Sequence, residues 1–242
     1  AKSETGDEAE TNIDVRQSGS TITAITYEGY TFKGATQATT YGADTWAGRS
    51  KAGNTTQDNK LTLSDASKTY ANVYGGWTSG TGTKAAADKQ NNSLNNTVDY
   101  TAGTVTGTLY GGYAANGEAS GNTVNLGAED GTYTANLRTT SIYGDNSTDG
   151  AVNNNTLNVR GKNITVDQVG NFDKYKFKLN DRIKNGDTML TIERGGFGRE
   201  IDWANNFTVD TSGLSGKPQG MITLVKSEET DALKFKEGYA PR

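Results

Sequence analysis

The sequence predicts an all-β fold, specifically a parallel β-helix (β-solenoid) that ends in a C-terminal β cap. Two short strand-like patterns alternate along the chain and recur at a nearly constant spacing. Hydrophobic residues, Gly not counted, make up 32% of the 242 residues, and Gly contributes 31. No segment places apolar residues at i, i+3, i+4 and i+7 over three turns, so we expect little helix.

The first pattern is a tyrosine followed by a glycine, with copies 33, 36 and 33 residues apart. The residues that mark this repeat are Tyr41, Gly42, Tyr74, Gly75, Tyr110, Gly111, Tyr143 and Gly144. Because glycine adopts positive φ at tight turns, we expect this pattern to mark a corner of the fold. The tyrosines are expected to pack inward or along a ladder, and stacking on sugars is the less favoured alternative.

The second pattern is an asparagine followed by alternating polar and apolar residues. Its four copies are the segments 59–63 (NKLTL), 96–100 (NTVDY), 122–126 (NTVNL) and 155–159 (NTLNV). Such alternation indicates a strand with one buried face. A unit of 33 to 36 residues cannot bury that face alone, so it must stack on copies of itself, as in a solenoid. An antiparallel β-sandwich or a β-roll remains the structural alternative.

The composition divides the chain into three parts. Residues 1–20 form an acidic leader, expected to be disordered or to donate a strand, and the first 14 residues account for the whole formal net charge of −4. Residues 21–166 carry the β-solenoid repeats. Residues 167–242 lose the Tyr-Gly spacing and gain larger apolar residues, which favours a C-terminal β cap over the otherwise open sheet ends.

The segments "VYGG", "LYGGYAANGEASGNTVNL" and "NNNTLNV" resemble the Gly/Asn/Thr-rich repeats of autotransporter passenger domains, the adhesins of diderm anaerobic bacteria. The later segment "NGDTMLTI" is similar to the cap region that closes many such passengers. The resemblance covers approximately residues 40–166 and the region that follows. It implies a right-handed parallel β-helix, a cap that seeds folding after export, and a role in adhesion or aggregation. We expect this chain to lack the membrane barrel of the family.

Catalytic chemistry finds little support in the composition. The chain has no His and no Cys, which excludes Ser-His-Asp and Cys-His catalysis, imidazole or thiolate metal ligands, and disulfides. A polysaccharide-active β-helix enzyme with paired carboxylates is the alternative. The candidate pairs are Glu129 with Asp130, Asp145 with Asp149, and Glu200 with Asp202. We favour solvated charges over catalysis for all three, and therefore predict no enzyme and no catalytic residue.

Binding motifs are equally weak, and we predict no cofactor and no metal. The segment 145–150 (DNSTDG) begins like a calcium loop, but its twelfth position is Thr156 rather than Glu, so we expect a turn. The glycine-rich segment 194–199 (RGGFGR) precedes neither a Lys-Ser/Thr pair nor a helix, so we expect a mobile loop rather than a phosphate cradle. The alternating Lys174, Lys176 and Lys178 are expected on the solvent side of a strand, and nucleic acid is not a predicted partner.

These observations predict an extracellular or bacterial cell-surface protein that is structural or adhesive. Its repeated β-solenoid faces would make many weak contacts, so that affinity comes from multivalency. The expected partners are host or bacterial surface glycans or proteins, or copies of the chain itself that join into aggregates or filaments by strand addition. No run of about 18 apolar residues is present, so no membrane span is expected in this chain.

Overall fold

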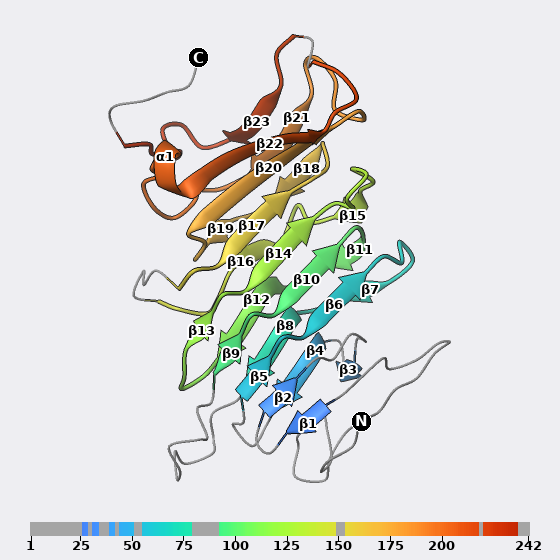
Figure 1. Cartoon of the computed structure of the whole chain (residues 1–242), viewed down its shortest axis with the longest axis vertical. Coiled ribbons are helices and arrows are strands. Elements are labelled where there is room, and N and C mark those ends of the chain that lie inside the picture. Colours follow the sequence, from blue (N-terminus) through green and yellow to red (C-terminus); the bar gives the residue numbers. More distant parts are fainter. Residues whose placement is uncertain are drawn as a thin grey trace.

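The chain folds into an elongated stack of strands, with the described N-terminal strands at one end and the C-terminal strands at the other (Figure 1). This computed structural model describes residues 26–28, 31–33, 39–41, 44–50, 55–78, 92–148, 153–217 and 220–236, the first three ranges by their backbone alone. Of the described residues, 51% lie in strands and 2% in helix. The all-β expectation is therefore confirmed. The acidic leader, residues 1–20, lies outside the described residues.

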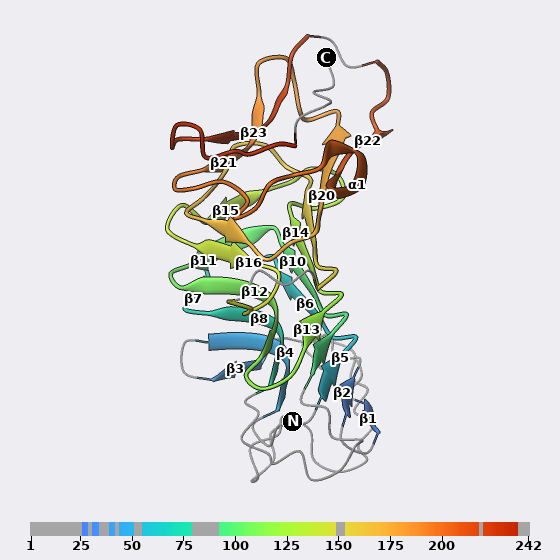
Figure 2. The same cartoon turned by 90° about the vertical axis from the view of Figure 1, so that its left-hand side faces the viewer.

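Two six-stranded sheets run the length of the stack (Figures 1 and 2). The sheet that carries the Tyr-Gly pattern, here the tyrosine sheet, has the order β19 (Val169–Gly170), β16 (Ser141–Tyr143), β12 (Thr108–Ala114), β8 (Val73–Thr78), β4 (Asp44–Ser50) and β3 (Thr39–Tyr41). The sheet whose strands follow the recurring asparagines, here the asparagine sheet, has the order β22 (Phe207–Gly213), β20 (Lys174–Asn180), β17 (Thr156–Val159), β14 (Thr123–Leu126), β10 (Thr97–Tyr100) and β6 (Lys60–Leu63).

Three smaller sheets complete the stack. The first contains β1 (Thr26–Glu28), β2 (Thr31–Lys33), β5 (Thr55–Gln57), β9 (Ser93–Leu94) and β13 (Ala119–Ser120). The second contains β15 (Thr134–Asn136), β11 (Ala102–Val105) and β7 (Thr69–Tyr70), and the third β18 (Ile164–Val166), β21 (Thr188–Ile192) and β23 (Thr223–Ser227). A single helical turn, α1 (Trp203–Asn206), precedes β22.

Strand pairing is parallel almost throughout. Among the described strands, only the hairpins β1–β2 and β3–β4, both at the N-terminal end, pair antiparallel. Successive strands of each sheet come from successive passages of the chain, which run from the tyrosine sheet to the asparagine sheet and back. One such passage is called a rung below. Parallel pairing across rungs does not fit the antiparallel β-sandwich that the sequence left open.

The asparagine pattern predicted the register of its sheet correctly. Leu61, Val98, Val124 and Leu157 occupy equivalent positions in β6, β10, β14 and β17. All four side chains are fully buried. Alternate residues of these short strands thus form continuous apolar columns through the core, as a strand with one buried face requires.

The tyrosine pattern predicted its register only in part. Tyr74, Tyr110 and Tyr143 do lie in register with one another. Tyr41, however, pairs antiparallel with Asp44 inside the terminal hairpin, and the residue in register with Tyr74 is Trp46. The spacing of 33 residues between Tyr41 and Tyr74 was therefore misleading. Gly42 and the side chain of Tyr41 lie outside the described residues.

Parallel stacking continues beyond residue 166, where the sequence placed the start of the cap. β20 pairs with β17 and β22 with β20, and β21 and β23 extend the sheet begun by β18. The core side chains change instead: Tyr175 and Phe177 take the column positions held by aliphatic residues in β17. The columns end at β22, where Phe207 is 9% exposed but Val209 is 45% exposed.

Candidate functional site

The candidate site is a strip of aromatic side chains on the outer side of the tyrosine sheet. Val73, Leu109 and Ile142 of this sheet point into the core and are fully buried. Side chains alternate across a strand, so the residues that follow them point outward. The aromatic strip consists of Trp46, Tyr74, Trp77, Tyr110, Tyr113 and Tyr143.

The rings of the aromatic strip stack along the axis of the fold. The Tyr74 and Tyr110 rings are stacked with centroids 5.4 Å apart and planes 5° apart, and Tyr110 and Tyr143 continue the stack at 5.9 Å. Trp77 and Tyr113 form a second stack at 6.3 Å. The Tyr113 ring meets Tyr74 and Tyr110 edge-on at 5.7 and 5.4 Å. These are favourable aromatic geometries, and each contact adds stability beyond burial alone.

A cation completes the N-terminal end of the strip. The guanidinium carbon of Arg49 lies 4.2 Å from the centroid of a Trp46 ring and 5.2 Å from that of Trp77. Arg49 is only 6% exposed, so this cation–π contact lies in a largely dry environment, where it is strongest. The sequence did not indicate that Arg49, Trp46 and Trp77 share a surface. They come together only because β4 and β8, from adjacent rungs, pair in parallel.

Burial sets the ionisation of the strip. The pKa of Tyr74 is raised well above its usual range, first by burial and then by the nearby Asp44 carboxylate. Burial also raises the pKa of Tyr110. Tyr74 is 9% exposed, whereas Trp77, Tyr110, Tyr113 and Tyr143 are partly exposed. The strip therefore presents an uncharged, amphipathic surface at neutral pH.

The glycines of the Tyr-Gly-Gly pattern lie within strands, so the corner interpretation is wrong. Gly76 and Gly112 are inside β8 and β12, and neither has positive φ. A Cβ atom added at Gly76 would overlap the amide of Asn96, and one added at Gly112 would overlap the amide of Asn122. Glycine is required here because the asparagine side chains occupy the space of a side chain.

These asparagines form a buried ladder that links the rungs. Asn59, Asn96, Asn122 and Asn155 are at most 1% exposed. The backbone N–H of each donates to a side-chain oxygen in the next rung: Asn59 to Asn96 at 3.1 Å, Asn96 to Asn122 at 3.0 Å, Asn122 to Asn155 at 2.9 Å and Asn155 to Asp173 at 3.1 Å. The side-chain amides of Asn59 and Asn96 also donate along the ladder, at 2.9 and 3.2 Å. The asparagine ladder thus satisfies buried polar groups that would otherwise destabilise the core.

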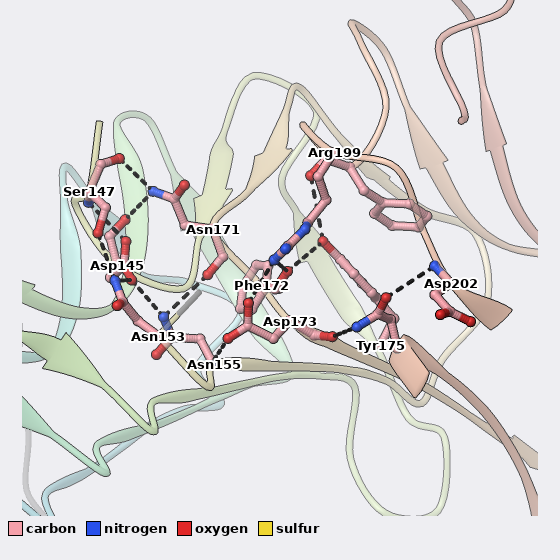
Figure 3. A network of polar contacts seen from close by, with 12 residues as sticks. Asp145, Ser147, Asn153, Asn155, Asn171, Phe172, Asp173, Tyr175, Arg199 and Asp202 are labelled. Atoms are coloured by element: carbon pink, nitrogen blue, oxygen red, sulfur yellow. Dashed lines mark hydrogen bonds and ion pairs between the residues drawn. The ribbon is translucent and has the colours of Figure 1, made fainter. Parts of the chain in front are cut away.

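The ladder ends at a charged residue (Figure 3). Asp173 replaces the asparagine of the next rung, and its Oδ1 accepts from Nη1 of Arg199 at 2.6 Å. The Asn155 amide turns instead to Oδ2 of Asp145, at 2.7 Å. Asp145 is fully buried and also accepts from the Ser147 backbone N–H and the Asn153 amide, both at 2.8 Å. The carboxylate of Asp145 is therefore satisfied by neutral donors.

A hollow of about 340 Å³ adjoins the C-terminal end of the aromatic strip. Tyr143 forms one wall, and Gly170 stands in register with it in the next rung. The glycine-rich segment 194–199 also lines the hollow. The rim carries the polar side chains of Gln168, Arg194 and Arg199.

The glycine-rich segment is anchored, in contrast to the mobile loop expected from sequence. Gly195 donates its N–H to Oε2 of Glu229 at 2.7 Å and accepts from Oγ of Ser227 at 2.7 Å. Phe197 is 1% exposed, with its ring centroid 4.2 Å from that of Tyr175. The segment is thus held at both its backbone and its central side chain.

None of the described candidate carboxylates is arranged as a catalytic pair. Glu129 binds Arg160 at 2.7 Å and also pairs with Lys178, whereas Asp130 binds Arg182 at 3.3 Å. The hydrogen bond from Lys178 lowers the pKa of Glu129, and the backbone N–H of Thr132 lowers that of Asp130. A general acid requires a raised pKa, so neither carboxyl group is suited to that role.

In the other two candidate pairs, the aspartates Asp145 and Asp202 are held by hydrogen bonds to neighbouring groups of the protein. Asp145 is held as described above, and Asp149 lies outside the described residues. Asp202 caps α1 by accepting from the Ala204 N–H at 3.0 Å, and its pKa is lowered first by the Asn205 amide. Glu200 is exposed.

Two further expectations concern charged motifs. In β20, Lys174 is exposed and Lys176 and Lys178 are partly exposed, while Tyr175 and Phe177 are buried, so the solvent-side prediction for the lysines is confirmed. Within the described ranges, no group of three or more acidic side chains is positioned to hold a metal ion. In that same part of the chain, no helix is long and apolar enough to cross a bilayer.

No protein-family model, curated protein or solved structure matches this chain.

Proposed function

We propose that this chain is an adhesive protein of the extracellular space or the bacterial cell surface, a passenger-type β-solenoid that binds through its repeated outer face. The observation that carries the proposal is the aromatic strip. The strip extends over four rungs on the outer side of a sheet whose opposite side is the core. Trp46 and Tyr74 are buried within it, and its partly exposed rings, Trp77, Tyr110, Tyr113 and Tyr143, come from three rungs. Continuous apolar surface of this kind marks interaction sites.

The physical properties of the strip suit adhesion. Tyrosine and tryptophan contribute large contact areas at low entropic cost and dominate the energy of many interfaces. The asparagine ladder holds the rungs in register, so the rings are organised before any partner binds. A row of similar contacts gains strength by multivalency when the partner surface is also repetitive.

Self-association through the C-terminal end of the fold is a second aspect of this proposal. β22 is the last strand of the asparagine sheet among the described residues, and most of its side chains are exposed, including Val209. An exposed edge strand can accept a strand from another copy. Light scattering over a concentration series should show growing assemblies, and a Val209→Lys variant should remain smaller; a monomer at all concentrations would contradict this aspect.

Adhesion can be tested with beads that carry the purified chain at several densities. The beads would be applied to surfaces coated with mucin, with matrix proteins or with the chain itself. We expect retention on at least one surface to rise more steeply than linearly with density. A Trp77→Ser/Tyr113→Ser variant should lose most of this retention, whereas Thr208→Ser, on exposed β22, should not. Equal retention of the variant and the wild type would contradict a role for the strip.

A further inference from the structure

We infer that the hollow at the end of the aromatic strip binds one uncharged sugar ring of a glycan, which stacks on the part of the Tyr143 ring that lines the hollow. This inference deepens the proposed adhesive function and rests on it. Three features of the hollow support it: the interruption of the tyrosine stack, the polar character of the walls, and the balanced charges around it.

The tyrosine stack is interrupted where the hollow begins. Tyr143 is covered on one side by Tyr110, with ring centroids 5.9 Å apart. The next residue in register is Gly170 instead of another aromatic residue. A Cβ atom at position 170 would lie 2.8 Å from Cε1 of Tyr143, so any side chain there would displace the ring. The Gly170 backbone therefore packs against one edge of the Tyr143 ring, and the ring also lines the hollow.

The walls favour a sugar over an aromatic side chain. A sugar ring has one C–H face, which packs on the electron-rich face of an aromatic ring, and hydroxyl groups around its edge. The rim provides matching polar groups, the amide of Gln168 and the guanidinium groups of Arg194 and Arg199. Each guanidinium group has more N–H donors than its carboxylate partner uses, and sugar hydroxyl groups can accept from the remaining donors whereas an aromatic side chain cannot. The volume of about 340 Å³ is at the small end of the range for ligand pockets.

The local charges are already balanced, which argues for an uncharged ligand. Arg194 binds both carboxylate oxygens of Asp167, at 2.7 and 2.6 Å. Arg199 binds Asp173 at 2.6 Å, and the Gly195 N–H that could receive an anion donates to Glu229. A phosphate or carboxylate ligand would have to displace these partners.

The walls are also organised in advance. Asn171, which lines the hollow, donates from its amide to the carbonyl groups of Asp145 and Ser147, at 2.9 and 3.0 Å (Figure 3). Arg199 is fixed through Asp173 to the end of the asparagine ladder. Little side-chain freedom remains to be lost on binding, which favours affinity.

The test measures binding of soluble oligosaccharides to the full chain by ligand-observed NMR. The probes are neutral hexasaccharides of glucose, mannose and N-acetylglucosamine, with a hexasaccharide of galacturonate as the acidic comparison. We expect at least one neutral probe to bind, with an affinity at least tenfold weaker in Tyr143→Leu. The Gln168→Ala variant should also weaken binding, and it decides the question if Tyr143→Leu fails to fold.

The matched control is Gln57→Ala, which makes the same change as Gln168→Ala in β5, outside both the hollow and the strip. It should bind the soluble probe like the wild type. Bead adhesion is measured in parallel: loss of hexasaccharide binding in Gln168→Ala with bead adhesion retained would separate the hollow from the strip. Binding of the acidic probe alone, binding of no probe, or unchanged binding in Tyr143→Leu and Gln168→Ala would each overturn the inference.

Discussion

The repeat region, residues 44–166, and the region from 167 to 236 use the same parallel pairing with different residues. In the repeat region each of the four rungs supplies an asparagine to the ladder and an aromatic ring to the strip. In the later region Asp173 replaces the asparagine and Gly170 replaces the tyrosine. The core columns also change from aliphatic residues to Tyr175 and Phe177.

This difference shows how a stacked fold can be propagated and then stopped. An asparagine both donates to and accepts from identical neighbours, so a ladder of asparagines can be extended by one more rung at any point. Asp173 receives the hydrogen bond from Asn155 through its carboxylate, which has no amide group to donate. Its backbone N–H donates back to the Asn155 carbonyl at 2.9 Å and does not extend the ladder. Its charge is then balanced by Arg199. Asp173, which stands where earlier rungs have asparagine, thus lies at the end of the ladder and also holds Arg199, one of the residues that line the hollow.

The largest expected effect is on the repeat region at alkaline pH. Burial raises the pKa of Tyr74, Tyr100 and Tyr133 well above their usual range. A raised pKa in the folded state stabilises the fold fully below the unfolded value of about 10, and this stabilisation is lost as pH rises toward the folded values. We expect cooperative unfolding above pH 10, with phenolate absorbance and loss of near-UV circular dichroism changing together.

The neutral range provides the control for that titration. The chain has no His, so few groups titrate between pH 5 and 8 and stability should be nearly constant there. Ionisation of all the tyrosines near pH 10 with the fold intact would contradict the burial of their phenol groups.

The second largest effect is expected from Asn122→Ala in the middle of the asparagine ladder. The substitution leaves the backbone N–H of Asn96 without its acceptor and removes the donor to the carbonyl of Ser93. We expect a loss of about 3 kcal/mol in the free energy of unfolding, measured by denaturant titration. Asn205→Ala, on the exposed side of α1, is the matched control and should cost far less; equal losses would show that the ladder is not a special source of stability.

The third prediction concerns the glycine that faces the ladder. Gly112→Ala places a methyl group against the Asn122 amide within the packed interior. We expect a loss of about 2 kcal/mol, as for other overpacked cores, measured by the same titration. Gly216→Ala is the matched control, because nothing lies within 4 Å of the added atom and its φ is not in the left-handed region. An unchanged free energy of unfolding in Gly112→Ala would indicate that the two sheets can move apart without loss of stability.

The smallest effect is expected from Asp173→Asn, which converts the end of the ladder into one more asparagine. The amide oxygen can still accept from the Asn155 N–H, but Arg199 loses its charged partner. Since the Arg199 side chain is 31% exposed and can reach water, we expect a loss of about 1 kcal/mol. Glu228→Gln breaks the exposed pair with Lys226 and should leave stability unchanged. A larger loss from Asp173→Asn than from Asn122→Ala would reverse the order proposed for the two regions.

The sequence by itself determined the strands of the asparagine sheet and their register. Alternation of polar and apolar residues is a local property of a strand, and the leading asparagine of each copy marks the same position in every rung. It did not determine the length of each rung. The ladder hydrogen bonds join residues 37, 26, 33 and 18 positions apart, because loops of different length connect equivalent strands.

Only the tertiary structure decided which residues share the candidate site. Trp46 takes the place that spacing assigned to Tyr41, since hydrogen bonding between strands fixes the register whatever the loop length. The requirement for Gly76 and Gly112 arises from asparagines of another strand in the same rung. The hollow depends on Gly170 standing beside Tyr143 and on a segment more than 20 residues later in the chain. Such contacts have no local pattern, because stacking creates them between rungs.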